Sequence, residues 1–325
     1  MLVAYSLTDN GPRTIDLAAG EVVPADARWI DLFQPTRDED RAAESFLAAS
    51  LPTREEASEI EFSSRFYVED GAVFMTASVL TGIERGTPVL APLTIVVSGD
   101  QRIATLRHEE LRAQKQFLVR ASRAGSGCVT TASVFHGLIE AIVDRTADVI
   151  EKVSADVDRI NQEVFAKRTE KRLGTRLSAL IGEIGFQGDV AAKARESLSS
   201  LERLVQFAGA ALPAGFGKGA NKNRLKLLAR DVRSLEDHVM FLSNKIQFLL
   251  DATLGLLSVE QNEVIRILTV AATIFFPPTL IGTIYGMNFD VMPELGWSWG
   301  YPLVLLVMLA SAVLPYLWFK LRGWL

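Results

Sequence analysis

Cysteine and histidine are scarce in this chain of 325 residues. Cys128 is the only cysteine, so neither a disulfide within the chain nor a metal site made of several thiolates can form. The 3 histidines, His108, His136 and His238, show no metal-ligand spacing with one another or with Cys128. The composition therefore favours a reducing, cytoplasmic environment and argues against a zinc centre.

Enzyme motifs and an excess of basic residues are also missing. No nucleophile elbow, glycine-rich dinucleotide turn or zincin signature occurs, and the Gly217-Lys218 pair lacks the spacing and the preceding strand of a phosphate loop. The net charge of -5 and the pI near 5.4 argue against a nucleic-acid binder. We therefore expect no enzymatic activity, no organic cofactor and no nucleic-acid partner.

Charge is absent from two long stretches near the C-terminal end. Residues 267–289 and 295–319 contain no Asp, Glu, Lys or Arg, and each exceeds the about 20 residues that a helix needs to cross hydrocarbon. Buried helices of soluble proteins rarely run this long without a polar face. The pattern predicts a membrane hairpin with a first span at about 264–286, an external loop at 287–300 and a second span at about 301–321.

The residues that flank these stretches indicate their orientation. Arg266 precedes the first stretch, Lys320 and Arg322 follow the second, and the loop holds only Asp290 and Glu294. Because basic residues stay on the cytoplasmic side, we expect both termini in the cytoplasm of a bacterial-type inner membrane. An external acidic loop with Glu294 concentrates cations near whatever lies beneath it.

Short apolar runs alternate with turn residues over 1–130, which predicts a cytoplasmic α/β sandwich domain. Strands are expected at 2–7, 28–32, 65–68, 72–80, 93–97 and 102–106. Helices are expected at 37–50 and 54–60, the second with Thr53 as its N-cap and Glu55 and Glu56 in its first turn. The order of the strands does not follow from the sequence.

Long helices are expected over 131–263, the predicted helical stalk. Apolar residues recur there at helical spacing, at Val134, Leu138, Ile142, Val149, Val153, Val157, Ile160 and Val164. A second helix is expected over 173–207, and a third runs from Asn221 into the first span, because no helix breaker occurs before Pro277. The predicted fold class is thus an α+β membrane protein with an N-terminal α/β sandwich, a stalk and two C-terminal spans, 264–325.

One face of the first span carries a stripe of residues about 3.5 positions apart. The stripe, mostly apolar at first and hydroxyl-bearing later, consists of Asn262, Ile265, Leu268, Ala272, Phe276, Thr279 and Thr283. Several copies of the helix around an axis would place the stripe on a pore, with Leu268 and Phe276 as candidate gate residues. Alternatively, the threonines bond to carbonyls of their own helix and the stripe only packs.

Pro277 and Pro278 lie in the middle of this span and remove backbone donors near Thr273 and Ile274. The helix is expected to bend or loosen there. A hinge is one interpretation, and a static kink satisfied by a neighbouring helix or by Thr273 is the other.

The turn between the spans contains a specific string of motifs. They are Tyr285-Gly286-Met287-Asn288, Met292-Pro293-Glu294-Leu295 and Trp297-Ser298-Trp299-Gly300-Tyr301-Pro302, with Trp324-Leu325 at the end. Together they resemble the CorA family of magnesium transporters, and similar segments at 51–54, 60–61, 65–66 and 259–262 extend the resemblance over nearly the whole chain. The resemblance implies a homopentamer around a central pore, with Mg²⁺ as the transported and the regulatory ion.

Within the family, the motif at Gly286, Met287 and Asn288 implies an ion filter. Mg²⁺ gives up its water shell reluctantly, and a ring of Asn288 carbonyls accepts hydrogen bonds from the bound waters without trapping the ion. Gly286 lets the chain turn and expose backbone carbonyls. An inside-negative potential of about 100 mV drives uptake of a divalent cation with about 4.6 kcal/mol, so no ATP site is required.

The resemblance also implies Mg²⁺ sensing by acidic residues between protomers. Asp231 and Asp251 on the long helix are candidates for such a site, and the alternative is that most carboxylates of this helix belong to a solvated face. Two other functions stay open, namely a related transporter of Zn²⁺, Co²⁺ or Ni²⁺, and a non-conducting membrane-anchored scaffold or sensor.

Overall fold

The computed structural model describes residues 1–9, 11–15, 21–59, 61–123, 127–166, 173–217, 220–288 and 292–323. The chain forms two compact units. The first consists of Met1–Ala166 and Gly182–Leu250, and the second of Lys167–Ile181 and Asp251–Leu325. The three segments expected from the sequence, 1–130, 131–263 and 264–325, divide the chain differently and stay a prediction.

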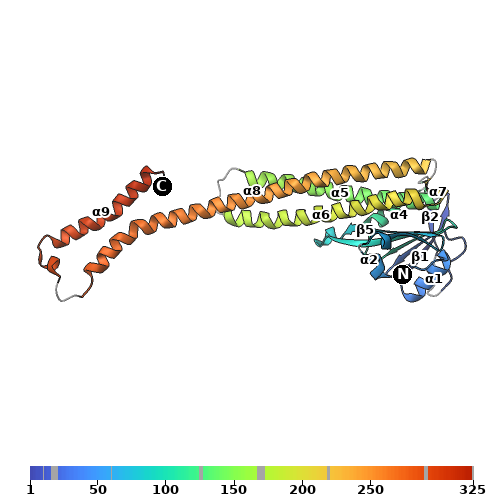
Figure 1. Ribbon diagram of the computed structural model, residues 1–325, viewed down its shortest axis with the longest axis horizontal. Coiled ribbons are helices and arrows are strands. Elements are labelled where there is room, and N and C mark those ends of the chain that lie inside the picture. The colour runs from blue at the N-terminus through green and yellow to red at the C-terminus, as the bar shows by residue number, and fades with distance from the viewer. Residues whose placement is uncertain are drawn as a thin grey trace. The chain divides into compact units, whose positions relative to one another are not determined.

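The first unit is built on one mixed sheet (Figure 1). Its strands are β1 (Leu2–Thr8), β2 (Gly11–Ile15), β3 (Trp29–Phe33), β4 (Phe66–Glu69), β5 (Ala72–Thr81), β6 (Val89–Val97) and β7 (Ile103–Arg107). Their order is β2-β1-β3-β7-β6-β5-β4, and the neighbouring pairs are antiparallel except β3 with β7. The expected strands are confirmed, although β6 begins earlier than expected. The sequence did not predict β2, because glycine and proline weaken its strand signal; it pairs only with β1, at the edge of the sheet.

Helices cover both faces of this sheet (Figure 1). On one face, Phe46 of α1 (Arg37–Leu47) joins an apolar cluster with Ile30 and Leu106. On the other, Phe117 of α4 (Arg112–Ala121) contacts the edge of Trp29, with ring centroids 5.9 Å apart. Trp29 and Ile30 point to opposite faces because side chains alternate along a strand. This layered arrangement confirms the expected α/β sandwich.

The remaining helices are mostly long. Their bounds are α2 (Arg54–Ser58), α3 (Phe62–Arg65), α5 (Thr131–Phe165), α6 (Leu173–Ala211), α7 (Ala214–Gly217), α8 (Ala220–Tyr285) and α9 (Gly300–Leu321), with 3-10 turns η1 (Ile83–Arg85) and η2 (Pro293–Gly296). The eight apolar positions that predicted α5 are all buried. α8 runs without interruption for 66 residues, which confirms the helix expected from Asn221.

Local capping determines where the short helices begin and end. The Glu56 N–H donates to Thr53 Oγ1 at 3.2 Å, and the Thr53 N–H donates to Glu56 Oε2 at 2.8 Å, so the expected N-cap of α2 is confirmed. α2 ends at Ser58, before Ile60, which lies outside the described residues. α1 ends at Leu47 rather than near 50, because Ala48 adopts the left-handed conformation with φ 56°.

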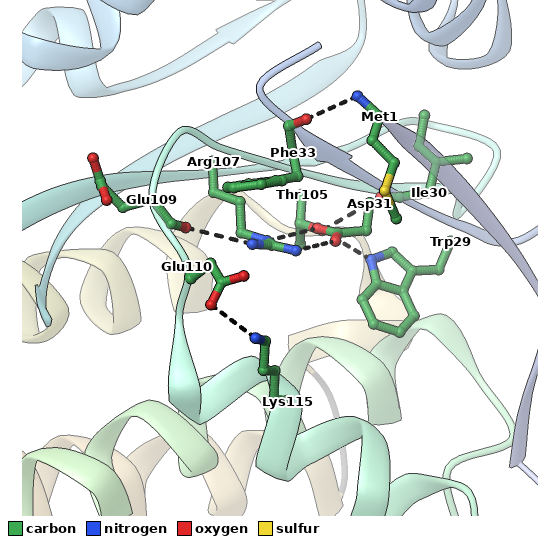
Figure 2. A network of polar contacts seen from close by, with 10 residues as sticks. All are labelled: Met1, Trp29, Ile30, Asp31, Phe33, Thr105, Arg107, Glu109, Glu110 and Lys115. Atoms are coloured by element: carbon green, nitrogen blue, oxygen red, sulfur yellow. Dashed lines mark hydrogen bonds and ion pairs between the residues drawn. The ribbon is translucent and has the colours of Figure 1, made fainter. Parts of the chain in front are cut away.

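A buried ion pair joins the two parallel strands of the sheet (Figure 2). Arg107 Nη2 of β7 lies 2.8 Å from Asp31 Oδ2 of β3, and both side chains are largely buried. The Thr105 hydroxyl donates to Asp31 Oδ1 at 2.7 Å, and Trp29 Nε1 donates to Thr105 Oγ1 at 3.1 Å. These hydrogen bonds offset part of the desolvation cost of the pair. Losing either charged partner would cost about 3–5 kcal/mol, because the other charge would stay buried without compensation.

Candidate functional site

The second unit contains the two apolar segments expected to cross a membrane, which are the C-terminal part of α8 and the whole of α9. Among the described residues, α8 and α9 are long and apolar enough to do so. Their large apolar side chains are exposed, for example Leu268 and Phe275 of α8 at 70% each and Leu306 of α9 at 64%. Such a surface is unfavourable in water and suits a lipid environment. Trp297, Trp299 and Tyr301 cluster before and at the start of α9, as aromatic residues do at membrane interfaces.

The predicted stripe lies on the least buried face of the α8 segment in this unit. All seven of its residues are exposed: Asn262, Ile265, Leu268, Ala272, Phe276, Thr279 and Thr283. The buried and half-buried positions between 262 and 285 fall on the opposite side of the helix, at Val270, Ala271, Ile274, Pro277, Pro278, Ile281 and Tyr285. Beside that second face, a Cβ on Gly282 would lie 3.3 Å from Met308 Cε of α9. The stripe is therefore left uncovered within one protomer.

Threonines on this part of α8 bond to their own helix. The hydroxyls of Thr279 and Thr283 donate to the carbonyls of Phe275 and Thr279 at 2.7 and 2.8 Å. This is the pattern that the packing interpretation requires. Each hydroxyl oxygen keeps its acceptor capacity, so the hydrogen bonds are also compatible with a stripe that faces water.

The motif residues follow directly after the end of α8. The Gly286 N–H donates to Gly282 O at 3.0 Å, and the Met287 N–H donates to Ile284 O at 3.3 Å. Gly286, Met287 and Asn288 are exposed. A Cβ on Gly286 would lie 3.1 Å from Gly282 O, so a larger residue would crowd this helix end.

The acidic residues of the loop are only partly described. Glu294 falls in η2, but its side chain and all of Asp290 lie outside the described residues. The expected role of Glu294 in concentrating cations therefore stays a prediction.

The proline pair does not interrupt α8. The helix continues through Pro277 and Pro278, although neither has an N–H for the carbonyls of Thr273 and Ile274. The Thr273 hydroxyl donates to Thr269 O at 2.8 Å, so it does not replace those missing donors. A static kink in which Thr273 supplies the missing hydrogen bonds is therefore the weaker explanation of the proline pair. The hinge stays a prediction.

Acidic residues of α8 do not gather into a metal site within one chain. Asp231 and Asp251 are both exposed, and no group of three or more His, Cys, Asp or Glu in the described part of the chain is arranged to hold a metal ion. Burial, and then the neighbouring carboxylate of Glu202, raises the pKa of Glu236. A regulatory site at Asp231 or Asp251 therefore stays a prediction.

The sequence did not predict the role of Glu260. Its Oε1 accepts a hydrogen bond of 2.8 Å from the N–H of Gly174, in the first turn of α6, so a carboxylate satisfies one of the free donors of that helix end. Glu260 belongs to the segment 259–262 that resembles the family. Its contact with Gly174 joins residues 86 positions apart, and local sequence periodicity cannot predict such a contact.

Known proteins resemble the chain over its whole length. Residues 24–321 match a family described as CorA-like Mg²⁺ transporter protein. The magnesium transport protein CorA of Pasteurella multocida is 33% identical over 327 residues, and that of Escherichia coli K12 is 31% identical over 328, with 100% of both chains covered each time. The structure of the CorA magnesium transporter from Methanocaldococcus jannaschii matches the fold with a TM-score of 0.72 at 17% identity, covering 100% of this chain and 99% of that one.

Proposed function

The chain belongs to the family of CorA-like Mg²⁺ transporter proteins, and on this premise we propose that it conducts Mg²⁺ through a pore lined by the stripe of α8. The observation that carries the proposal is the exposure of the whole stripe on the side opposite the buried face of α8. Asn262, Thr279 and Thr283 are poor neighbours for lipid, so packing copies of the chain around these polar residues is favourable.

A pore of this kind requires several copies of the chain. One hairpin of α8 and α9 cannot enclose a water-filled path, whereas identical helices related by cyclic symmetry can. The family implies an assembly of five copies, in which each stripe residue becomes a ring around the axis. The rings of Leu268 and Phe276 would form an apolar neck, and those of Thr279 and Thr283 a polar section.

The proposed filter lies where α8 ends. A ring of Asn288 side chains offers carbonyl oxygens to the waters of a hydrated Mg²⁺, and the nearby carbonyls of Gly286 and Met287 add acceptors. Uncharged acceptors hold the ion weakly enough for it to leave. An inside-negative membrane potential then drives uptake without ATP.

The filter is tested by Mg²⁺ flux into liposomes that contain the purified protein and a Mg²⁺-sensitive dye. We expect Asn288→Ala to reduce the initial flux about tenfold or more, since the ring loses its side-chain acceptors and each lost charge-assisted hydrogen bond costs about 1.5–3 kcal/mol. The matched control is Asn223→Ala, the same substitution at an exposed position of α8 in the first unit, which should conduct like the parent.

The same assay separates the alternative functions. Undiminished Mg²⁺ flux in Asn288→Ala would show that Asn288 is not part of the filter. Flux of Zn²⁺, Co²⁺ or Ni²⁺ without flux of Mg²⁺ would indicate a different cargo. No cation flux in the parent protein would support a scaffold or sensor instead.

A further inference from the structure

A cavity of about 350 Å³ lies in the first unit, where α4 ends and α5 begins, next to the start of α8. Ligand pockets in proteins commonly enclose about 300–1,000 Å³. The polar side chains that line it are Arg120, Arg123, Cys128, Ser133, Glu140 and Arg224. The proposed transport function makes no use of this cavity.

The lining has an excess of positive charge in a chain whose net charge is -5. Arg224 donates from Nε and Nη2 to the two carboxylate oxygens of Glu140, at 2.5 and 2.6 Å. Arg120 donates from Nη1 to Asp144, which lies outside the lining, at 2.9 Å. A guanidinium group has about five N–H donors, so both arginines are held in place and still have donors to offer.

Arg123 adds a third guanidinium group, just beyond the end of α4. No carboxylate in the described part of the chain forms an ion pair with it, and the residue is exposed. Its charge is therefore not balanced locally, unlike the charges of Arg120 and Arg224.

The remaining groups of the lining do not oppose an anion. Burial raises the pKa of the Cys128 thiol, which therefore stays uncharged at neutral pH. Thr130 and Ser133 form the capping box at the start of α5, and the positive end of this 35-residue helix adds to the potential of the arginines. Among the described residues of the lining, Glu140 is the one carboxylate, and Arg224 neutralises it.

We propose that this cavity binds a small soluble anion with a phosphate group, either inorganic phosphate or a phosphomonoester, through Arg120, Arg123 and Arg224. Guanidinium groups match phosphate oxygens in geometry and form charge-assisted hydrogen bonds with them. Three guanidinium groups, two at the end of α4 and one from α8, suit a tetrahedral dianion better than a planar carboxylate, which one guanidinium fork can satisfy. The size of the cavity restricts the ligand to a small molecule.

Isothermal titration calorimetry tests the proposal on the full-length protein in detergent. The probes are glycerol 3-phosphate and inorganic phosphate, with glycerol as the uncharged control, in a buffer with a chelator and no Mg²⁺. We expect at least one of the two phosphate probes to bind saturably, with one molecule bound per chain. Glycerol should not bind. Arg123→Gln should weaken the binding about tenfold, as expected for one charge-assisted hydrogen bond at an exposed position.

Arg41→Gln is the matched control for charge, because Arg41 is an exposed arginine of α1 outside the cavity. It should bind the probes like the parent protein. Because Arg123 is exposed, its substitution should leave the unfolding midpoint unchanged, which the same samples can verify. Arg224→Gln is unsuitable, since it would leave Glu140 unpaired.

Three results would overturn the proposal: no saturable binding by the parent protein, an equal loss of affinity in Arg41→Gln and Arg123→Gln, or unchanged affinity in Arg123→Gln. The titration involves no Mg²⁺ and no transport. Its failure would therefore leave the proposed pore unaffected, and failure of the flux assay would leave the anion site unaffected.

Discussion

Gly137 of α5 lies against the ring of Phe117 of α4. A Cβ at this position would be 2.6 Å from Cε2 of Phe117, whose ring also contacts Trp29 of the sheet. In Gly137→Ala the Phe117 ring must move. Overpacking of this kind costs about 1–3 kcal/mol, which equals or exceeds the about 1 kcal/mol that alanine adds in helix propensity. We expect a lower urea midpoint for the detergent-solubilised protein.

Gly185→Ala in α6 is the control for this substitution. A Cβ on Gly185 meets no atom within 4 Å, so alanine should raise the unfolding free energy by about 1 kcal/mol at most. If Gly137→Ala were as stable as Gly185→Ala, the close approach of α4 and α5 would have no energetic consequence.

Tyr5 should make the stability of the first unit fall at alkaline pH. Burial, with a smaller contribution from Asp31, raises its pKa to about 12, while an unfolded tyrosine titrates near 10. The folded state therefore keeps the phenol proton more tightly than the unfolded state does. The contribution of the Tyr5 phenol to the free energy of unfolding is fully present below pH 10. It is lost as the pH rises from about 10 to about 12.

Comparison with Tyr5→Phe isolates this effect from other groups that titrate in the same range. Phenylalanine can keep the stacking on Trp29, whose ring centroid lies 4.3 Å away, and it has no proton to lose. Unfolding free energies measured between pH 9 and 12 should fall more steeply in the parent protein. Parallel curves for both proteins would contradict the assignment to Tyr5.

At the scale of elements, α8 combines a helix of the first unit with the first apolar span. Phe276 and its neighbour Phe275 are similarly exposed, at 68% and 70%, but only Phe276 belongs to the stripe. If the Phe276 rings form an apolar constriction that excludes water, Phe276→Ser should let water enter the pore at this level. The leak of Mg²⁺ at high internal Mg²⁺ should then increase several-fold. Flux from loaded liposomes measures this leak.

Phe275→Ser changes the same residue type about 100° around the helix and should leave the leak unaltered. An equal leak in both variants would indicate general damage to the span. An unaltered leak in Phe276→Ser would exclude a gate at this position.

Local signals were sufficient for most of these elements. The 3.6-residue period predicted α5, the lack of breakers predicted α8, and Thr53 with Glu56 marked the start of α2. α4 was missed, because Leu111 provides no side-chain cap at its start and its charged residues obscure its apolar face. The short strand β2 was missed because Gly11 and Pro12 weaken its strand signal.

At the scale of the whole molecule, the proposed pore depends on assembly. The family implies five copies, so the protein in detergent should have a mass of about five times 35.7 kDa after subtraction of the detergent. Light scattering coupled to size-exclusion chromatography measures this mass. A stable monomer or dimer that still conducts Mg²⁺ would contradict a pore built from a ring of α8 stripes.

The amino-acid sequence alone was enough to predict the family, the class of the fold, the two apolar spans and the stripe of α8. These features depend on composition, periodicity and short motifs, which are properties of neighbouring residues. Three features could be identified only in the folded chain: the strand order, the ion pair between Asp31 and Arg107, and the cavity lined by Arg224 together with Arg120 and Arg123. Such contacts join residues far apart in the chain, and they form only when packing of the sheet and helices overcomes the entropy of closing the intervening loops.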